Sequence, residues 1–255
     1  MQWAEIREDA LRAFDRVGSG GQFVLGREGR EFEQALAKLW GLDHAAGVAS
    51  GMDAIEIALR VLGCSPGDRV LTTPLSAFAT TLAIIRTGAI PVFADTDSRG
   101  LIDLARCREL LRTKPGIRYF VPVHLYGHSL DVPELRNLRE DFGLKIVEDC
   151  AQSIGADFRG EVPGSAGQLA ATSFYPTKNL GAMGDGGAIL TRDASLDARV
   201  RALRDYGQTA KYRHEYLGSN SRLDEVQAAF LLDACLPRFE KWTRRRREIA
   251  GAYLD

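Results

Sequence analysis

Short apolar segments rich in β-branched residues alternate with longer segments of helical pattern along almost the whole chain. This alternation is typical of a mainly parallel sheet with helices on both faces, because each parallel connection has to cross the sheet. The predicted strands are Ala45–Ala49, Arg69–Thr73, Ile90–Ala94, Arg118–His124, Lys145–Glu148, Ala171–Phe174 and Gly187–Thr191. We therefore predict an α/β fold with three α/β/α layers around a mostly parallel sheet of about seven strands.

The predicted helices carry apolar residues at intervals of three and four positions. They are Glu28–Trp40, Asp53–Leu62, Ala77–Thr87, Leu104–Arg112, Pro133–Phe142, Ala194–Asp205 and Leu223–Cys235. A final charged segment, Pro237–Asp255, is expected to form a long helix. No internal repeat or linker divides the sequence, so we expect one domain over residues 1–255.

The composition excludes several functional classes. The formal charge of −1 gives no general attraction for nucleic acid or acidic membranes. No apolar run approaches the roughly 20 residues of a membrane helix, and the acidic residues in Met1–Asp9 do not fit a signal peptide. The run Arg244–Arg247 is interpreted as a solvated helix face, since no aromatic residues are interleaved with it.

The four cysteines give no sign of a metal site. Cys64, Cys107, Cys150 and Cys235 are widely scattered and lack paired metal-type spacing. Reduced, buried thiols in a cytoplasmic protein are the expected state. No metal is therefore predicted.

A lysine and an upstream aspartate carry the clearest chemical signal. Lys178 follows Ser173 by five residues, and Asp149 ends an apolar run with Gln152 about one helical turn later. These are the groups that a pyridoxal phosphate (PLP) enzyme needs. Lys178 would hold the aldehyde as a Schiff base, and Asp149 would keep the pyridine nitrogen protonated so that the ring draws electrons from a carbanion. Gln152 could hydrogen-bond the phenolic oxygen, and Ser173 the phosphate.

The segment Ser50-Gly-Met-Asp53 joins a predicted strand to a helix. Free amide N–H groups at a helix start attract phosphate, and Gly51 lets the backbone approach closely. Phe78, after the next strand, could stack on the pyridine ring or belong to the core. Asp149 could also cap the following helix. For Lys178, flanking Pro176 and the stretch Gly181–Gly187 favour a fixed position over an exposed loop.

The chain resembles the large domain of the DegT/DnrJ/EryC1/StrS aminotransferases, the sugar aminotransferase branch of the aspartate aminotransferase superfamily. Matching segments are Phe23–Gly26, Ser50–Ala54, Pro122–Gly127, Glu148–Gln152, Ser173–Gly181, Gly184–Gly187 and Asn220–Ala228. The resemblance implies that Lys178 carries PLP, that Asp149 faces its ring nitrogen and that Gln152 meets its phenolic oxygen. Ser173 and the amides of Gly51 and Met52 would bind the phosphate, and Phe78 would stack on the ring.

The resemblance also implies partners. A homodimer with shared active sites is expected, in which Asn220 reaches the neighbouring subunit's phosphate. Substrate contacts are expected from His124, Tyr126, Tyr175, Tyr206 and Arg222. Related sugar dehydratases carry histidine at the position of Lys178, so the lysine favours transfer of an amino group from glutamate to a keto sugar. The segment Tyr206–Glu225 resembles members that aminate C3 of dTDP-linked 3-keto-6-deoxyhexoses.

Three features depart from the family pattern. Met52 stands where members usually have threonine, and Leu75-Ser-Ala77 replaces a common polar-aromatic pattern. Relatives also continue beyond the last helix into a smaller carboxy-terminal domain. Two alternatives stay open. One is a degenerate PLP-fold protein with a binding or regulatory role, and the other is an aminotransferase for a keto-cyclitol or an aminobenzoate precursor.

Overall fold

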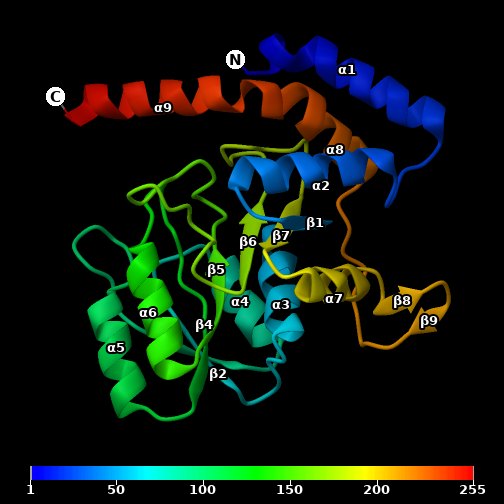
Figure 1. Cartoon of the computed structure of the whole chain (residues 1–255). Helices are drawn as coiled ribbons and strands as arrows, with labels where there is room; N and C mark the ends of the chain where they lie inside the picture. The colour runs from blue at the N-terminus through cyan, green and yellow to red at the C-terminus, as the bar shows by residue number, and fades with distance from the viewer. Residues whose placement is uncertain (1, 255) are drawn as a thin grey trace.

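The computed structural model describes residues 2–254, and its centre is a seven-stranded sheet of order β1-β7-β6-β5-β4-β2-β3 (Figure 1). The strands are β1 (His44–Val48), β2 (Arg69–Thr72), β3 (Ile90–Phe93), β4 (Ile117–Phe120), β5 (Lys145–Asp149), β6 (Leu169–Ser173) and β7 (Gly187–Thr191). Pairs from β6 to β3 are parallel, whereas β7 runs antiparallel to both β1 and β6. The predicted fold class and the seven strands are confirmed.

The main helices are α1 (Gln2–Gly20), α2 (Arg27–Trp40), α3 (Gly51–Val61), α4 (Phe78–Arg86), α5 (Leu104–Thr113), α6 (Val132–Phe142), α7 (Ala194–Arg204), α8 (Glu225–Phe230) and α9 (Phe239–Leu254). A π-helical turn (Leu231–Cys235) and a short 3-10 turn (Leu236–Arg238) connect α8 to α9. The last residue of the predicted final helix, Asp255, lies outside the described residues. Helix α1 and the small hairpin of β8 (Gln208–Ala210) and β9 (Arg213–His214) were not predicted.

The two faces of the sheet carry different helices. Val147, Ala171 and Ile189 belong to a core shared with α3, α4 and α7. Their neighbours in the strands alternate to the other face, where Leu190 packs with α2 and α8, and Ile146 with α5 and α6. This alternation produces the three predicted layers (Figure 1).

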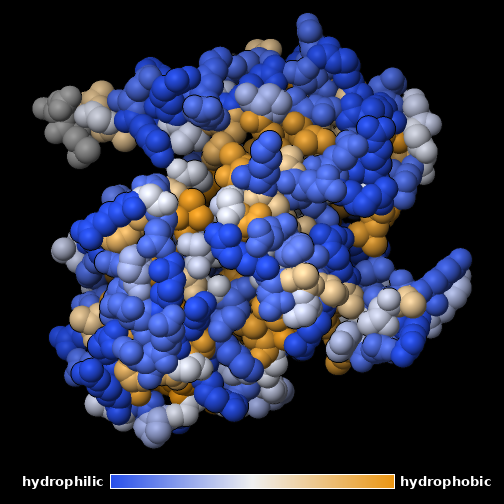
Figure 2. All heavy atoms as spheres, viewed as in Figure 1, coloured by the Kyte–Doolittle hydropathy of each residue, from blue (hydrophilic) through white to orange (hydrophobic). Residues whose placement is uncertain are grey.

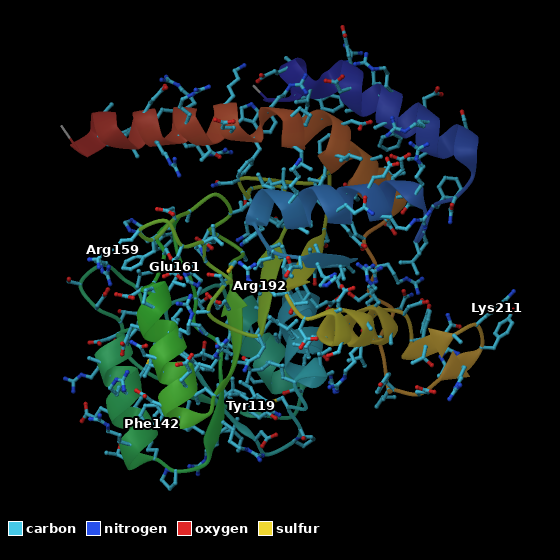
Figure 3. All side chains as sticks on the ribbon, viewed as in Figure 1. Tyr119, Phe142, Arg159, Glu161, Arg192 and Lys211 are labelled. Atoms are coloured by element: carbon cyan, nitrogen blue, oxygen red, sulfur yellow. The ribbon has the colours of Figure 1, made fainter. Side chains whose placement is uncertain are left out.

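Helix α1 lies beside α9 above the α2 layer, so the two ends of the chain share one side of the molecule (Figure 1). Polar side chains cover most of the face in Figure 2, and apolar ones gather between this upper layer and the elements below it. On the other side, the β8–β9 hairpin projects from the body with Lys211 at its outer end (Figure 3).

The predictions about the cysteines and about membrane helices can be compared with the structure directly. All four cysteines are buried and none forms a disulfide, as expected for reduced core thiols. Among residues 2–254, no helix combines the length and apolar character needed to cross a bilayer.

Candidate active site

The carboxyl ends of β1, β5 and β6 meet at one edge of the sheet, where α/β proteins commonly bind ligands. The loops there enclose a cavity of about 440 Å³. Its lining includes six of the predicted cofactor-binding residues, namely Gly51, Met52, Asp149, Gln152, Ser173 and Lys178. The structure therefore brings together groups that are up to 127 positions apart in the sequence, from Gly51 to Lys178.

One corner of this cavity is suited to a phosphate. Helix α3 begins at Gly51, and the Ser50 hydroxyl caps it by accepting the N–H of Asp53 at 3.1 Å. The first N–H groups of a helix lack partners within it and attract anions. A Cβ atom at Gly51 would lie 2.6 Å from Cβ of Ser173. Glycine is thus required for the Ser173 hydroxyl to sit against the helix start.

Asp149 is a buried carboxylate at the end of β5. Its Oδ2 accepts a hydrogen bond from the Thr80 hydroxyl at 2.7 Å, and its Oδ1 accepts the N–H of Ala151 at 3.1 Å. Burial raises the pKa of Asp149, and these hydrogen bonds oppose that rise. Within residues 2–254 it forms no salt bridge. A protonated ring nitrogen is the kind of partner that this carboxylate lacks.

Lys178 approaches the cavity from the loop that follows β6. Its backbone N–H donates to the carbonyl of Tyr175 at 2.8 Å. Gly181 closes the loop against Pro176, since a Cβ there would lie 2.6 Å from the Pro176 carbonyl oxygen. Burial lowers the pKa of the Lys178 ammonium, and the charge of Asp149 opposes this. The lowered pKa increases the fraction of neutral amine, which is the nucleophilic form.

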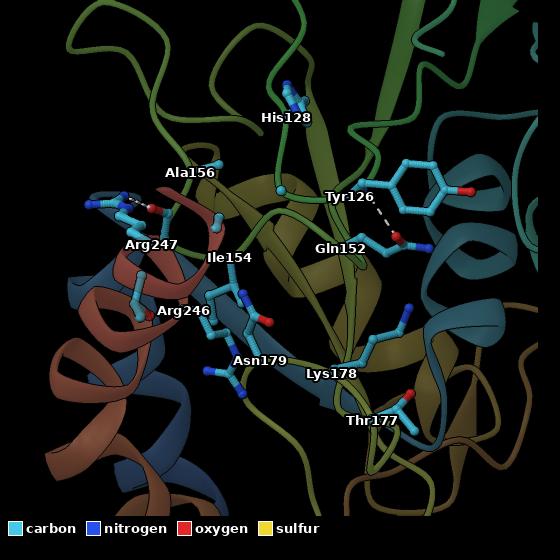
Figure 4. A pocket seen from close by; sticks show the side chains of 14 residues that line it. Tyr126, His128, Gln152, Ile154, Ala156, Thr177, Lys178, Asn179, Arg246 and Arg247 are labelled. Atoms are coloured by element: carbon cyan, nitrogen blue, oxygen red, sulfur yellow. Dashed lines mark hydrogen bonds between the residues drawn. The ribbon is translucent and has the colours of Figure 1, made fainter. Parts of the chain in front are cut away.

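Gln152 lies beside Lys178 with its side chain already oriented (Figure 4). Its Oε1 accepts the N–H of Tyr126 at 3.2 Å, which leaves its amide N–H groups available to an acceptor. The cavity therefore offers an amine for an aldehyde, a buried carboxylate for a ring nitrogen, an amide donor for a phenolic oxygen and a helix start with a hydroxyl for a phosphate. Together, these four groups fit PLP.

Thr80 was not predicted as a site residue. It is buried in the first turns of α4, donates to Asp149, and lies 2.8 Å from the Ser76 hydroxyl. Both residues line the cavity. No local sequence motif points to Thr80, because its contact with Asp149 spans 69 positions.

The prediction that His124 contacts substrate is wrong. Its side chain is fully buried, with Nε2 2.9 Å from Oε2 of Glu148. Its Nδ1 accepts the N–H of Leu130 at 3.1 Å, so Nε2 carries the proton and donates it to Glu148. Glu148 also accepts three backbone N–H groups, from Gly164, Ala166 and Gly167. The His124–Glu148 pair therefore belongs to the buried core. Neither ring nitrogen of His124 is free to bind a substrate, since both already have partners.

The remaining predicted residues lie at different distances from the cavity. Tyr175 lines it, whereas Phe78 is 68% exposed at the start of α4 and is not part of its lining. The structure therefore does not place Phe78 as a ring over the cavity. Tyr126 is exposed and lines an adjoining cavity.

Three of the predicted residues lie together, outside the cavity lining. The Arg222 guanidinium is 5.0 Å from the centroid of the Tyr206 ring and pairs with Asp205 at 2.7 Å. Asn220 is exposed, and its backbone forms a β-bridge with Asp205. Within one chain, these residues do not complete the cavity.

Comparison with known proteins gives consistent matches over nearly the whole chain. The model of the DegT/DnrJ/EryC1/StrS aminotransferase family matches residues 4–255. The chain is 41% identical over 253 residues to UDP-N-acetyl-3-dehydro-alpha-D-glucosamine 3-aminotransferase of Acidithiobacillus ferrooxidans, covering 99% of this chain and 68% of that protein. It is 44% identical over 254 residues to dTDP-3-amino-3,4,6-trideoxy-alpha-D-glucose transaminase of Streptomyces venezuelae, covering 99% and 66%.

A solved structure gives a similar result. The fold matches the crystal structure of S. venezuelae DesV in complex with a ketimine intermediate, with a TM-score of 0.94 and 45% identity. That match covers 99% of this chain and 67% of the DesV chain. This chain thus spans about two thirds of the length of the relatives it matches.

Proposed function

Because this chain belongs to the DegT/DnrJ/EryC1/StrS aminotransferase family, we propose that it transfers an amino group to C3 of a nucleotide-linked keto sugar, with glutamate as the donor. The expected enzyme class, a PLP-dependent aminotransferase, is confirmed by this membership. The position C3 is supported by the names of two relatives, a 3-aminotransferase and a transaminase for a 3-amino sugar. The observation that carries the proposal is the single cavity shared by Lys178, Asp149, Gln152 and Ser173.

When bound, PLP supplies an electron-withdrawing ring that stabilises negative charge at the reacting carbon and stores the amino group between donor and acceptor. The protein's own groups hold and move protons. Asp149, which Thr80 holds in position, would keep a proton on the ring nitrogen by accepting its hydrogen bond. Gln152 would donate to the phenolic oxygen, and Ser173 with the start of α3 would bind the phosphate.

Lys178 has two roles in this proposal. Its Nζ would hold the cofactor's aldehyde carbon, and as a neutral amine it would accept the proton from the α-carbon of the donor. The lowered pKa of Lys178 supports both roles, because each requires the neutral amine. The stiff loop between Pro176 and Gly181 restricts where this amine can move.

We extend the proposal to a homodimer with shared sites. Asn220 is exposed and does not line the cavity of its own chain, which supports a role toward a second copy. The neighbouring β8–β9 hairpin projects from the body (Figure 3) and would extend the surface available to that copy. The four buried, unpaired thiols favour a reducing compartment, so we propose a cytoplasmic location.

Two experiments test these statements. A panel of dTDP- and UDP-linked 3-keto and 4-keto sugars, a keto-cyclitol and an aminobenzoate precursor would be incubated with glutamate and PLP-loaded enzyme. Amination at C3 of a nucleotide sugar is the expected result, and amination of only another acceptor would contradict it. For the dimer, mixing inactive Lys178→Ala and Asn220→Ala chains should restore activity. No recovery in mixed dimers verified by native mass spectrometry would argue against shared sites.

A further inference from the structure

The hydroxyl of Ser221 joins two parts of the chain that lie far apart in the sequence. Ser221 stands between Asn220 and Arg222, and only 1% of it is exposed. Its Oγ accepts the backbone N–H of Ala49 at 3.0 Å and donates to Oδ2 of Asp53 at 2.8 Å. One buried hydroxyl thus uses both its acceptor and its donor capacity on the same short segment.

Ala49 and Asp53 stand on either side of the joint between β1 and α3. The strand ends at Val48 and the helix begins at Gly51. Ser221 therefore holds the joint at two points, one before the first helical residue and one two residues after it. A ligand-binding segment that is held by a second layer of hydrogen bonds keeps its geometry before the ligand arrives.

Two backbone N–H groups of this joint are left for a ligand. The Ser50 hydroxyl already accepts the N–H of Asp53 at 3.1 Å. The N–H groups of Gly51 and Met52 donate to no other residue among those that the structure describes, and both residues line the candidate cofactor cavity. We call these two N–H groups, together with the Ser173 hydroxyl, the phosphate corner. Its use depends on the direction in which the two N–H groups point.

Strand β7 restricts the same joint by close packing. Gly187 pairs with Val48, and a Cβ atom at Gly187 would lie 2.5 Å from the carbonyl carbon and oxygen of Ser50. Packing of this kind prevents the backbone of the joint from moving toward β7. The hydrogen bonds of Ser221 do more, because they hold the joint at a fixed distance and orientation from a partner.

The segment that carries Ser221 is itself firmly held. Its backbone N–H donates to the Arg204 carbonyl at 2.9 Å, and the N–H of Ser219 donates to the Leu203 carbonyl at 2.8 Å. Arg204 is buried, and its guanidinium donates to the carbonyl of Gly47 in β1 at 2.7 Å. The position of the Ser221 hydroxyl is therefore set by α7 and β1.

The bond to Asp53 also controls a negative charge close to the phosphate corner. Asp53 lies in the first turn of α3, next to Met52, yet it is not among the described residues that line the cavity. Its Oδ2 is directed to Ser221 instead. A carboxylate that turned into the cavity would repel a phosphate.

We propose that Ser221 is a positioning residue for the phosphate corner. Its hydroxyl fixes the joint so that the N–H groups of Gly51 and Met52 point at the phosphate, and it holds the charge of Asp53 away. This inference deepens the proposed function and rests on the proposed binding of the phosphate at the start of α3. Because Asn220 is the adjacent residue, the same hydroxyl connects the phosphate corner to the segment that we propose reaches a second copy.

The test compares two ligands that differ in the phosphate alone. PLP and pyridoxal, which has a hydroxyl group in place of the phosphate ester, would be titrated into the cofactor-free protein and followed by absorbance. The ratio of the two Kd values measures the preference for the phosphate. We expect Ser221→Ala to reduce this preference by roughly five- to tenfold, since two hydrogen bonds that hold the corner are lost.

Two further variants serve as controls. Ser221→Thr keeps a hydroxyl and should retain most of the wild-type preference. Ser219→Ala should leave the preference unchanged, because Ser219 is exposed in the same segment and its hydroxyl makes a long bond, of 3.5 Å, to the Leu203 carbonyl. Inorganic phosphate gives an independent measure, since it should raise the Tm of cofactor-free wild type more than that of cofactor-free Ser221→Ala.

The ratio of Kd values separates a positioning role from a general loss of structure. If Ser221→Ala weakens the binding of both ligands equally, its hydroxyl supports only the fold and the inference is wrong. It is also wrong if Ser221→Ala keeps the preference while Gly51→Ala, which disrupts the corner directly, loses it. If neither variant changes the preference, the start of α3 does not bind the phosphate, and the inference fails together with that part of the proposed function. Amination of a keto sugar by wild type is a separate measurement and judges the proposed reaction.

Discussion

The Thr80 hydroxyl donates a hydrogen bond to Oδ2 of Asp149 at 2.7 Å, although the two residues lie on different elements 69 positions apart. Thr80 belongs to α4 and Asp149 ends β5. The bond stabilises the charged form of a carboxylate whose pKa is raised by burial. Thr80 therefore acts as a positioning residue for Asp149, the group that we propose faces the cofactor ring.

Replacing Thr80 by valine tests this relationship. The change keeps the side-chain shape and removes the donor, so we expect PLP affinity to fall by roughly fivefold, in line with the ~1 kcal/mol of a typical hydrogen bond. PLP titration followed by absorbance measures the Kd. Ser76→Ala serves as the control, since Ser76 contacts Thr80 and not Asp149, and it should cost less. Equal losses in both variants would contradict a specific role for Thr80.

Asp149 should give the cofactor-free protein a characteristic pH dependence. Because its pKa is raised on folding, the folded state holds this proton more tightly than the unfolded state. The contribution of Asp149 to the free energy of unfolding therefore falls as pH rises from about 3.9, the pKa of an unperturbed aspartate, through the raised pKa of the folded state. Urea unfolding of wild type and Asp149→Asn at several pH values measures this. The difference in unfolding free energy should shift in favour of the variant as pH rises, and a constant difference would refute the assignment.

Gly51→Ala should weaken cofactor binding through steric conflict. The added Cβ would meet Ser173 Cβ at 2.6 Å and push the hydroxyl away from the start of α3. We expect at least a tenfold rise in the Kd for PLP, since both groups that we propose bind the phosphate would shift, with a stability cost of about 1–3 kcal/mol for overpacking. Gly18→Ala is the control, because nothing lies within 4 Å of its added Cβ. Unchanged PLP affinity in Gly51→Ala would show that this corner does not bind the phosphate.

Met52→Thr should strengthen cofactor binding. Met52 lines the cavity beside Gly51, and a threonine there would add a hydroxyl donor to the phosphate corner. One hydrogen bond is worth about 1 kcal/mol, so the Kd for PLP should fall by roughly fivefold. Met52→Val, which adds no hydroxyl, controls for the change in size. Identical affinities for the threonine and valine variants would mean that the hydroxyl finds no phosphate.

Much of the fold could be predicted because its signals are local. The strand Gly187–Thr191 was predicted with the bounds that the structure has. The predicted strand Lys145–Glu148 is one residue shorter than β5, which ends at Asp149. Helix α1 was not predicted, although its buried residues Ile6, Ala10, Ala13 and Val17 recur at intervals of three and four positions. The β8–β9 hairpin was missed because its strands have three and two residues and mostly exposed side chains, so they lack an apolar pattern.

The site was predictable only where a short motif carries the chemistry. Lys178, Asp149, Gln152, Ser173 and Gly51 come from such segments, and the fold brings them to one cavity. His124 lies in a similar motif, yet its ring is used inside the core by Glu148 and Leu130. Sequence spacing does not show which way a side chain points.

The identity of the cofactor-carrying lysine is the central claim, and borohydride reduction tests it most directly. Reduction fixes the covalent bond between PLP and the amine that holds it, and peptide mapping then identifies the labelled residue. We predict a label on Lys178 and none on the other lysines, with Lys178→Ala unlabelled and Lys211→Ala, at the tip of the hairpin, labelled as in wild type. A label on any other lysine, or on none in protein saturated with PLP, would contradict the account.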